Sequence, residues 1–179
     1  MTGVQTCALP ISYTAVISGK AVNGTETTGV ALAEIYEDDA TAGRLVNLSS
    51  RGFVSPGASV MIPAFVTGNL ATPTPKKLLI RGVGPALTTF GVPNVLANPT
   101  LSVVDSAGRT VATNDDWETN SNLAELRTVT AQLAFPLAAG SRDAALLLSL
   151  PSGAFTCVVS GVGNTSGTAL VEVYEVSGL

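Results

Sequence analysis

The residues best suited to bind a ligand are four oxygen-bearing side chains in the second half of the sequence. Asn114, Asp115 and Asp116 are consecutive, and Asp105 lies one short hairpin earlier. Clustered carboxylate and amide oxygens at a turn suit calcium, which takes about six to eight oxygen ligands. The spacing is not that of an EF-hand loop, and Asn-Asp runs also form Asx turns without metal. The sequence therefore predicts either a calcium site at these residues or a turn stabilised by its own side chains.

Candidate catalytic groups are few. The sequence contains no histidine, which removes the commonest general base and the commonest metal ligand. Serine and threonine are abundant, but no histidine can activate them. A carboxylate pair for glycoside hydrolysis depends on a separation that only the fold sets, and the acids of this chain cluster at turns. We therefore predict that the protein is not an enzyme and that it uses no cofactor, calcium excepted.

A glycine-rich segment at residues 82–87 begins like a dinucleotide-binding loop. The third glycine of that fingerprint is absent, Pro85 removes a backbone donor, and no βαβ pattern follows. The alternative is a strand-to-turn transition in which glycines adopt backbone angles that other residues avoid. Of these two interpretations, the turn is favoured over phosphate binding.

Two further polar side chains lie in apolar surroundings. Arg81 is inside the apolar run 79–83, where an unpaired charge is costly, so we expect it to pair with a buried acid such as Glu172. Cys157 lies in the apolar run 155–159. A buried structural thiol is expected there rather than a nucleophile.

An internal repeat organises the elements that position these residues. Residues 13–19 match residues 155–161, and residues 30–37 match residues 168–175. Each matched pair predicts two strands joined by a turn-rich loop. A repeat at this distance indicates tandem domains rather than the short period of a solenoid.

The repeat divides the chain into three parts. We expect residues 12–39 to be the C-terminal hairpin of a preceding copy and residues 40–179 to be one complete module. Residues 2–11 resemble the translation of a sequencing adapter, so residues 1–11 are predicted to be a non-native prefix, Cys7 included. The acidic run at residues 37–39 is a second candidate for calcium, although a solvated charge run is the stronger interpretation.

Within the module, apolar or β-branched runs bounded by turn residues predict further strands. These runs are residues 44–54, 59–67, 77–83, 100–105, 110–114 and 144–150. One stretch breaks the pattern, since leucine and valine recur at helical spacing from Leu123 to Leu133. We predict a short helix or helical loop at residues 122–133, capped by Asn122 and Glu125. Short strands with one helical insertion predict an all-β fold, an antiparallel β-sandwich of jelly-roll type.

The composition excludes several functional classes. Charged residues make up only 12% of the chain and the net charge is −4, so no basic face is available for nucleic acid or an anionic membrane surface. No apolar run reaches the roughly 18–20 residues that span a bilayer, so membrane insertion is not expected. A surface of Thr, Ser, Asn and Gly is common in extracellular β-proteins.

Several motifs occur in a fixed order along the module. They lie at residues 44–52, 79–87, 113–117, 150–161 and 169–174. In this order they resemble a repeat module of large secreted or surface proteins of environmental bacteria. Residues 99–161 are also remotely similar to bacterial pre-peptidase C-terminal domains, which are β-sandwich accessory modules of secreted proteases. The resemblance implies secretion or a cell-surface location and an accessory role, and it supplies no active site.

Together these observations favour a non-catalytic secreted β-sandwich module for spacing, display or adhesion at the cell surface. Its expected partners are neighbouring copies of the module in the parent chain, with surface glycan or protein as a further partner. The alternative is a glycan-binding module, assisted by calcium, which needs exposed aromatic side chains such as Trp117 or Tyr174. A third class is a chaperone-like or propeptide-like domain attached to an enzyme.

Overall fold

The regular elements of the chain lie between Asn47 and Glu175. The computed structural model describes residues 14–21, 23–25, 29–36, 45–57, 59–68 and 73–176. The chain divides into two units, residues 1–44 and residues 45–179. The strands are β1 (Asn47–Val54), β2 (Ala64–Thr67), β3 (Lys76–Val83), β4 (Pro99–Asp105), β5 (Thr110–Asn114), β6 (Ala144–Leu150), β7 (Gly153–Gly161) and β8 (Gly167–Glu175). The helices are α1 (Leu123–Leu133) and the short 3-10 helices η1 (Pro85–Phe90), η2 (Trp117–Thr119) and η3 (Val162–Asn164). Across the described ranges, none of these helices has both the length and the apolar character needed to cross a membrane.

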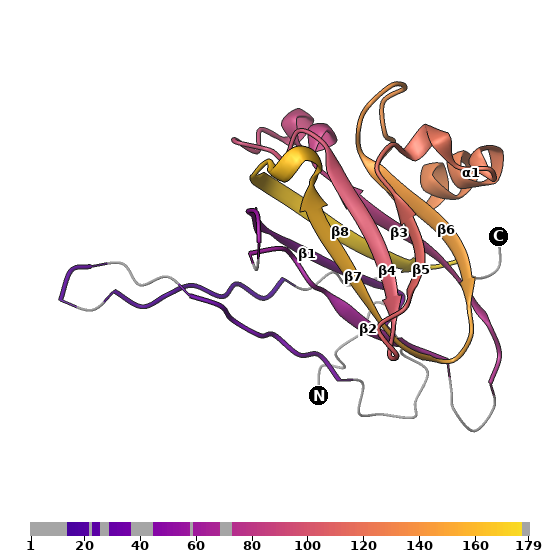
Figure 1. The fold of residues 1–179 in the computed structure, drawn as a ribbon, viewed down its shortest axis with the longest axis horizontal. Coiled ribbons are helices and arrows are strands. Elements are labelled where there is room, and N and C mark those ends of the chain that lie inside the picture. Colours follow the sequence, from indigo (N-terminus) through magenta and orange to yellow (C-terminus); the bar gives the residue numbers. More distant parts are fainter. Residues whose placement is uncertain are drawn as a thin grey trace, which may run out of the picture. The chain divides into compact units, whose positions relative to one another are not determined.

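The strands form two four-stranded antiparallel sheets that pack face to face (Figure 1). Their orders are β1–β8–β3–β6 and β2–β7–β4–β5, so that successive strands alternate between the sheets except at β4–β5. This order is that of an eight-stranded jelly roll. The predicted jelly-roll β-sandwich is confirmed, and the strands predicted at residues 110–114 and 144–150 have those bounds in the structure.

The closing strands β7 and β8 lie in different sheets. β7 pairs with β2 and β4, whereas β8 pairs with β1 and β3. Between them, Gly163 and Asn164 have φ of 68° and 58°, and this left-handed backbone turns the chain from one sheet to the other. A closing hairpin was predicted and is wrong for the complete module, because each strand finds its hydrogen-bond partners in a different sheet.

The main core fills the space between the sheets. Val171 and Val173 of β8 point into it and Glu172 points to the opposite face, as the alternation of the sequence predicts. Cys157 of β7 is fully buried in the same core and is not in a disulfide, as expected for a structural thiol. Cys7 lies outside the described residues, as do residues 1–13 and 37–39, for which a prefix and an acidic linker were predicted.

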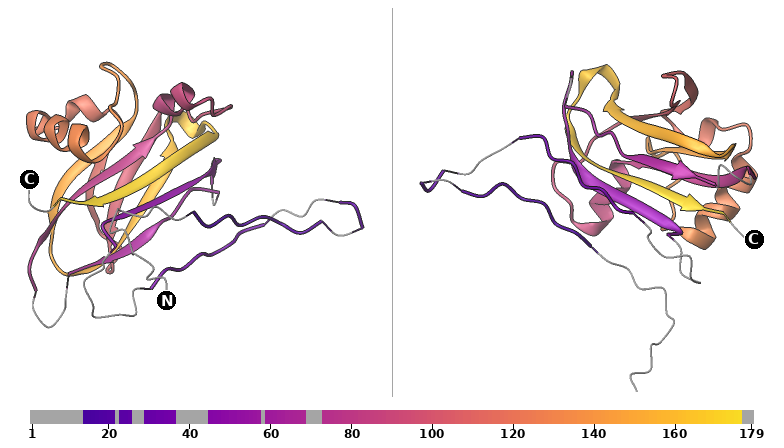
Figure 2. Two further views of the ribbon diagram at one scale, coloured as in Figure 1. Left: turned by 180° about the vertical axis from the view of Figure 1, so that it is seen from behind. Right: turned by 90° about the horizontal axis from the view of Figure 1, so that it is seen from below.

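A second core covers the outer face of the β1–β8–β3–β6 sheet and includes side chains of α1 and η2. Figure 2 shows the coil of α1 beside the strands. Leu126 and Val129 of α1 lie in it with Leu79 of β3. Because both faces of β3 are covered, all of its residues from Leu78 to Val83 are buried, the charged Arg81 included.

The predicted helix is confirmed, and its predicted capping pair is wrong. The Asn122 side chain makes no capping hydrogen bond and donates instead to the Leu147 carbonyl oxygen at 3.0 Å. Glu125 forms an ion pair with Lys77. Both side chains therefore hold α1 to the strands beneath it. These contacts arise from tertiary structure, so the local sequence could not predict them.

Candidate functional site

Asp105 stabilises its own hairpin. Its Oδ1 accepts hydrogen bonds from the backbone N–H groups of Ala107 and Arg109, each at 2.9 Å, and its Oδ2 accepts one from Arg109 Nε at 2.8 Å. The backbone hydrogen bond from Arg109, followed by the one from its side chain, lowers the pKa of the Asp105 carboxyl. These contacts form the Asx-type turn that was the alternative to calcium for this residue.

The structure does not bring Asp105 together with the other three predicted calcium ligands. Val104 pairs with Thr110 at one end of the β4–β5 ladder, and Leu101 pairs with Asn114 at the other. An antiparallel hairpin therefore places Asp105 and Asn114 at opposite ends of its length. The remaining candidates for calcium at this site are residues 114–116.

Asn114 is buried and joins β5 to neighbouring elements. Its Oδ1 accepts a hydrogen bond from the Ala145 N–H at 3.0 Å. Its Nδ2 donates to the Asp116 carbonyl oxygen at 3.0 Å and to Thr119 Oγ1 at 3.1 Å. The amide oxygen that a cation would need already accepts a backbone hydrogen bond, so Asp115 and Asp116 carry the oxygens that are left.

A polar depression lies beside Asp115. It has a volume of about 230 Å³ and is lined by Thr100, Thr113, Asn114, Asp115 and Thr119. Threonine hydroxyls and one carboxylate suit a ligand rich in hydroxyl groups or a cation. Within the described ranges, no three His, Cys, Asp or Glu side chains are grouped so that they could hold a metal ion. Calcium binding here stays a prediction.

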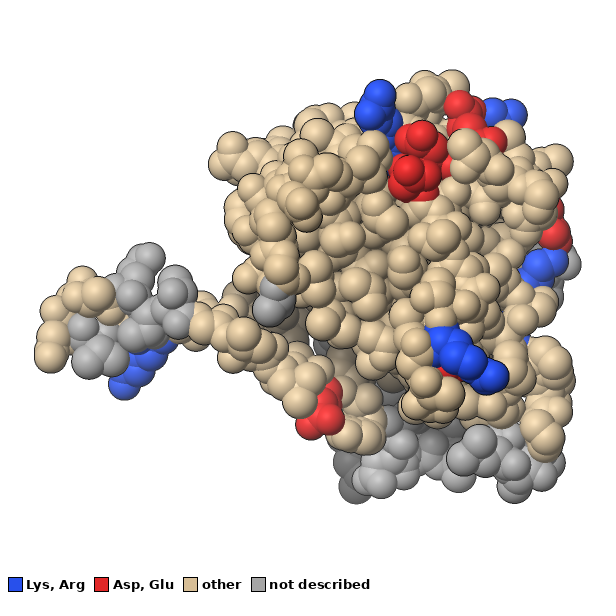
Figure 3. All heavy atoms as spheres, viewed as in Figure 1, with Lys and Arg blue, Asp and Glu red and all other residues tan. Residues whose placement is uncertain are grey.

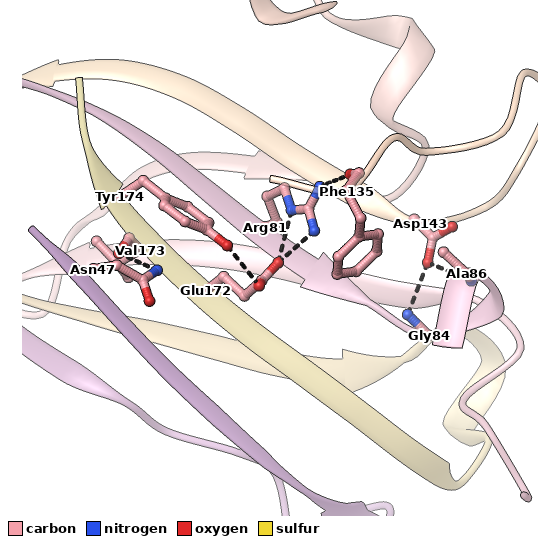
Figure 4. Close-up of polar contacts among 9 residues, drawn as sticks. All are labelled: Asn47, Arg81, Gly84, Ala86, Phe135, Asp143, Glu172, Val173 and Tyr174. Carbon is pink, nitrogen blue, oxygen red and sulfur yellow. Dashed lines mark hydrogen bonds and ion pairs between the residues drawn. The ribbon is translucent and has the colours of Figure 1, made fainter. Parts of the chain in front are cut away.

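The glycine-rich loop before η1 binds an anion that the chain itself supplies. Asp143 is fully buried, and its Oδ1 accepts hydrogen bonds from the N–H groups of Gly84 at 2.8 Å and Ala86 at 3.2 Å (Figure 4). Its Oδ2 accepts a hydrogen bond from Ser141 Oγ at 2.8 Å. The backbone donors that a phosphate would need are thus occupied, which supports the turn interpretation of this loop.

Sequence reasoning missed this role of Asp143. The signal was an isolated acid immediately before the apolar strand β6, a position where a buried carboxylate needs donors. The loop also requires glycine, because a Cβ at Gly84 would lie 2.0 Å from the Leu96 carbonyl oxygen. The Asp143 carboxylate and the lack of a side chain at Gly84 together set the path of the backbone from β3 into η1.

A buried ionic cluster, formed by Arg81, Glu172 and Tyr174, lies on the outer face of the first sheet. Arg81 Nε donates to Glu172 Oε2 at 2.8 Å, and the Tyr174 hydroxyl donates to Glu172 Oε1 at 2.8 Å (Figure 4). Phe135 covers the cluster, since its carbonyl accepts from Arg81 at 2.6 Å and its ring lies 4.1 Å from the guanidinium carbon. Burial and the neighbouring Glu172 carboxylate raise the pKa of Tyr174. The predicted pairing of Arg81 with Glu172 is confirmed.

The aromatic side chains proposed for sugar stacking are not flat exposed platforms. Trp117 is 4% exposed, and its Nε1 donates to the Ala138 carbonyl oxygen at 3.2 Å. Tyr174 is half-buried and its hydroxyl is bound to Glu172. Phe53 and Phe90 are exposed aromatic residues, and Phe90 makes an edge-to-face contact with Phe135. The geometry thus gives no support to Trp117 or Tyr174 as sugar-binding residues.

The β2–β7–β4–β5 sheet has an outer face almost without charge. Asp105 is the one charged residue in its four strands. In the view of Figure 3, Lys, Arg, Asp and Glu gather in a few small groups, with uncharged surface between them. Such a surface has little means to steer a charged ligand.

Comparisons with known proteins give a structural similarity. No family model matches the chain, and no curated protein matches it. A solved structure that resembles it is the pre-peptidase C-terminal domain of collagenase from Bacillus anthracis. The two have 12% sequence identity and a TM-score of 0.43, over 72% of this chain and 89% of that one. This solved domain is of the class that the sequence motifs resemble.

Proposed function

We propose that this chain is a non-catalytic, secreted β-sandwich repeat module that spaces, displays or attaches other parts of a protein at the bacterial cell surface. The observation that carries the proposal is that its buried polar side chains hold the fold together. Asn114, Asp143 and Glu172 are all buried, and each is bound by groups of the sandwich itself. A catalytic site instead keeps such groups available to a substrate.

The cysteine supports the same proposal. Cys157 is fully buried between the sheets, and burial raises the pKa of its thiol to about 12. The thiolate is the nucleophilic form of cysteine, so this thiol is inert at neutral pH. With no histidine in the sequence, serine and threonine lack the usual base as well.

The test of location uses antibodies raised against the purified chain. We expect them to label intact cells of the producing bacterium or to detect the parent protein in the medium. External protease should remove the label from intact cells. An antigen confined to the cytoplasmic fraction would overturn the proposed location.

The test of catalysis uses the full chain with panels of polysaccharide, ester and peptide substrates. We expect no turnover above that of the heat-denatured chain. Turnover that follows the folded protein through purification would overturn the non-catalytic part of the proposal.

The polar depression beside Asp115 favours one second candidate, a glycan-binding module assisted by calcium. Thr100, Thr113 and Thr119 line it together with Asp115. A glycan array with the full chain, in calcium and in EDTA, decides between the two. Binding that is lost in EDTA and in Asp115→Asn, but kept in the surface control Arg109→Gln, would favour the glycan-binding module.

A further inference from the structure

Residues 14–36 resemble the closing strands β7 and β8 in sequence, and one side-chain hydrogen bond is common to both segments. The Tyr36 hydroxyl donates to Glu34 Oε1 at 2.9 Å, and the Tyr174 hydroxyl donates to Glu172 Oε1 at 2.8 Å. Both pairs are two residues apart, which is the spacing of side chains on one face of a strand. In the sandwich, Arg81 completes this pair as a buried ionic cluster. Residues 14–36 therefore carry two of the three members of such a cluster.

The apolar side chains of this segment are exposed where their counterparts are buried. Ile17 is 57% exposed, and its counterpart Val159 is fully buried. Ile35 is 61% exposed, and its counterpart Val173 is 7% exposed. The described residues of this segment form no regular strand. Its sequence thus has the pattern of a core strand pair, and covering these side chains would be favourable by the hydrophobic effect.

A glycine in the segment also indicates that another chain segment packs against it. Gly167 begins β8, and a Cβ there would lie 2.5 Å from Leu96 N and 2.6 Å from Leu96 Cα. Its counterpart Gly29 has nothing within 4 Å of the corresponding Cβ position. Residue 167 must be glycine because the backbone of Leu96 packs against it. Its presence at residue 29 fits a segment that receives the same kind of chain.

We propose that residues 14–36 are the seventh and eighth strands of a second copy of this sandwich. The partner is a set of six strands of the same kind as β1–β6. In the assembled copy, residues 15–19 lie between the second and fourth strands of one sheet, and residues 31–36 lie between the first and third strands of the other. An arginine of the third strand pairs with Glu34, as Arg81 does with Glu172. The inference rests on the repeat character in the proposed function and names the partner of that repeat.

The test supplies six such strands to the chain. In an extended chain, a second copy of residues 45–153 precedes residue 12, so that residues 12–36 follow it as residues 154–174 follow the original. We expect amide hydrogen exchange in residues 31–36 to slow by about 100-fold or more relative to the original chain, because they become a central strand. Unchanged exchange in these residues, with residues 45–176 still protected, would overturn the inference and leave the proposed function intact.

A substitution at Glu34 tests the ionic cluster itself. In the extended chain, Glu34→Ala should abolish most of the new protection, because the arginine of the added copy is left buried without a counter-charge. The matched control Lys20→Ala, in the connecting loop, should leave the protection in place. In the original chain, Glu34→Ala should leave exchange of the sandwich unchanged. Full protection in the extended Glu34→Ala chain would contradict the predicted ion pair.

A transplant gives an answer even if the extended chain aggregates. Residues 14–36 differ from their counterparts in the two strands by few side chains. The transplanted full chain carries Cys157→Ala, Val159→Ile, Thr168→Val, Val171→Ala and Val173→Ile. We expect one cooperative unfolding transition, because larger and smaller apolar side chains offset one another. Loss of cooperative unfolding would show that the segment cannot serve as these strands, and would overturn the inference.

Discussion

Arg81 and Glu172 face away from the space between the sheets, and both are nevertheless buried because Phe135 and the second core cover them. A buried ion pair contributes little net stability over an apolar replacement of similar size, since both charges lose their hydration. Removing one partner is different, because the other charge then stays buried alone. The pair therefore makes the sandwich sensitive to single substitutions at these two positions.

We expect Arg81→Met to lower the free energy of unfolding by about 3–5 kcal/mol, because the Glu172 side chain is then buried without its cationic partner. The double variant Arg81→Met with Glu172→Leu should recover most of that loss. Urea denaturation at neutral pH measures both. The control is Lys77→Met, whose ion pair with Glu125 is solvent-exposed and should contribute less than about 1 kcal/mol. Equal losses for Arg81→Met and Lys77→Met would contradict this account.

Cys157 makes the free energy of unfolding depend on pH in the alkaline range. Burial raises the pKa of its thiol from 9.0 to about 12, so above pH 9 the unfolded chain releases this proton and the folded chain keeps it. Stability is then present below pH 9 and is lost as the pH rises. We expect this group to lower the free energy of unfolding by about 1.4 kcal/mol between about pH 8 and pH 10.

Urea denaturation of the chain and of Cys157→Ala checks this dependence. The variant is expected to be less stable at pH 8 because of the cavity it creates, but to lose less stability than the original chain on going to pH 10. Ending the series at pH 10 limits the contribution of Tyr174, whose pKa is raised in the same direction from 10.0. Parallel pH dependences for both chains would rule out the thiol as their source.

The sequence predicted the Arg81–Glu172 pair because both positions lie inside apolar alternation, where a charge must find a partner. It did not predict the partner of Asp143, because Gly84 and Ala86 lie about 60 residues away and offer only backbone N–H groups. Backbone donors have no sequence signature. Asp105 lies apart from the other three predicted calcium ligands for a related reason, since the β4–β5 pairing sets the distance between Asp105 and Asn114.

At the scale of elements, the passage from β3 into η1 depends on close packing. Gly84 precedes η1 and has Leu96 and Pro99 against the position of a Cβ, with the Leu96 carbonyl oxygen at 2.0 Å. Any side chain at this position must displace the backbone at residue 96. A shift of residue 84 itself would instead move its N–H, which is one of the two backbone donors to Asp143.

Gly84→Ala is therefore expected to lower the free energy of unfolding by about 3 kcal/mol or more, in the range of severe core substitutions. Gly29→Ala serves as the matched control, because nothing lies within 4 Å of that Cβ position, and its effect should stay within about 0.5 kcal/mol. Thermal unfolding of both variants by circular dichroism measures the difference. A Gly84→Ala variant as stable as Gly29→Ala would show that the loop relaxes without cost.

The positions of the strands could be predicted from the sequence. Which strands pair with one another was harder to predict. The strand bounds follow from apolar runs ended by turn residues, which act locally. The assignment of β7 and β8 to different sheets depends on β1 to β4, far earlier in the chain. A short turn-rich connection fits a hairpin and an arch between sheets equally well, so the local sequence could not separate the two.

At the scale of the whole molecule, the two units differ in how their backbone is protected. The described residues of unit 1 are all exposed, Lys20 among them, whereas the strands of unit 2 have paired backbone groups. Proteases cut exposed backbone without regular hydrogen bonding before they cut sheets.

We expect limited trypsin digestion to cleave after Lys20 before it cleaves within residues 45–176. Mass spectrometry of the products, with circular dichroism of the protected fragment, checks this order. In the Lys20→Ala variant, the cut at residue 20 should disappear while residues 45–176 stay intact. Early cleavage after Arg109 or Arg142, with residue 20 uncut, would contradict the expected order.

The order of the strands also bears on how such a chain is synthesised and folds. β7 lies between β2 and β4, and β8 lies between β1 and β3, so both sheets stay open at their centres until the last two strands arrive. A ribosome adds about 5–20 residues per second, and six strands emerge before either central strand does. The nascent module therefore stays unfolded until its synthesis is nearly complete. The jelly-roll order thus ties the folding of this module to the completion of its synthesis.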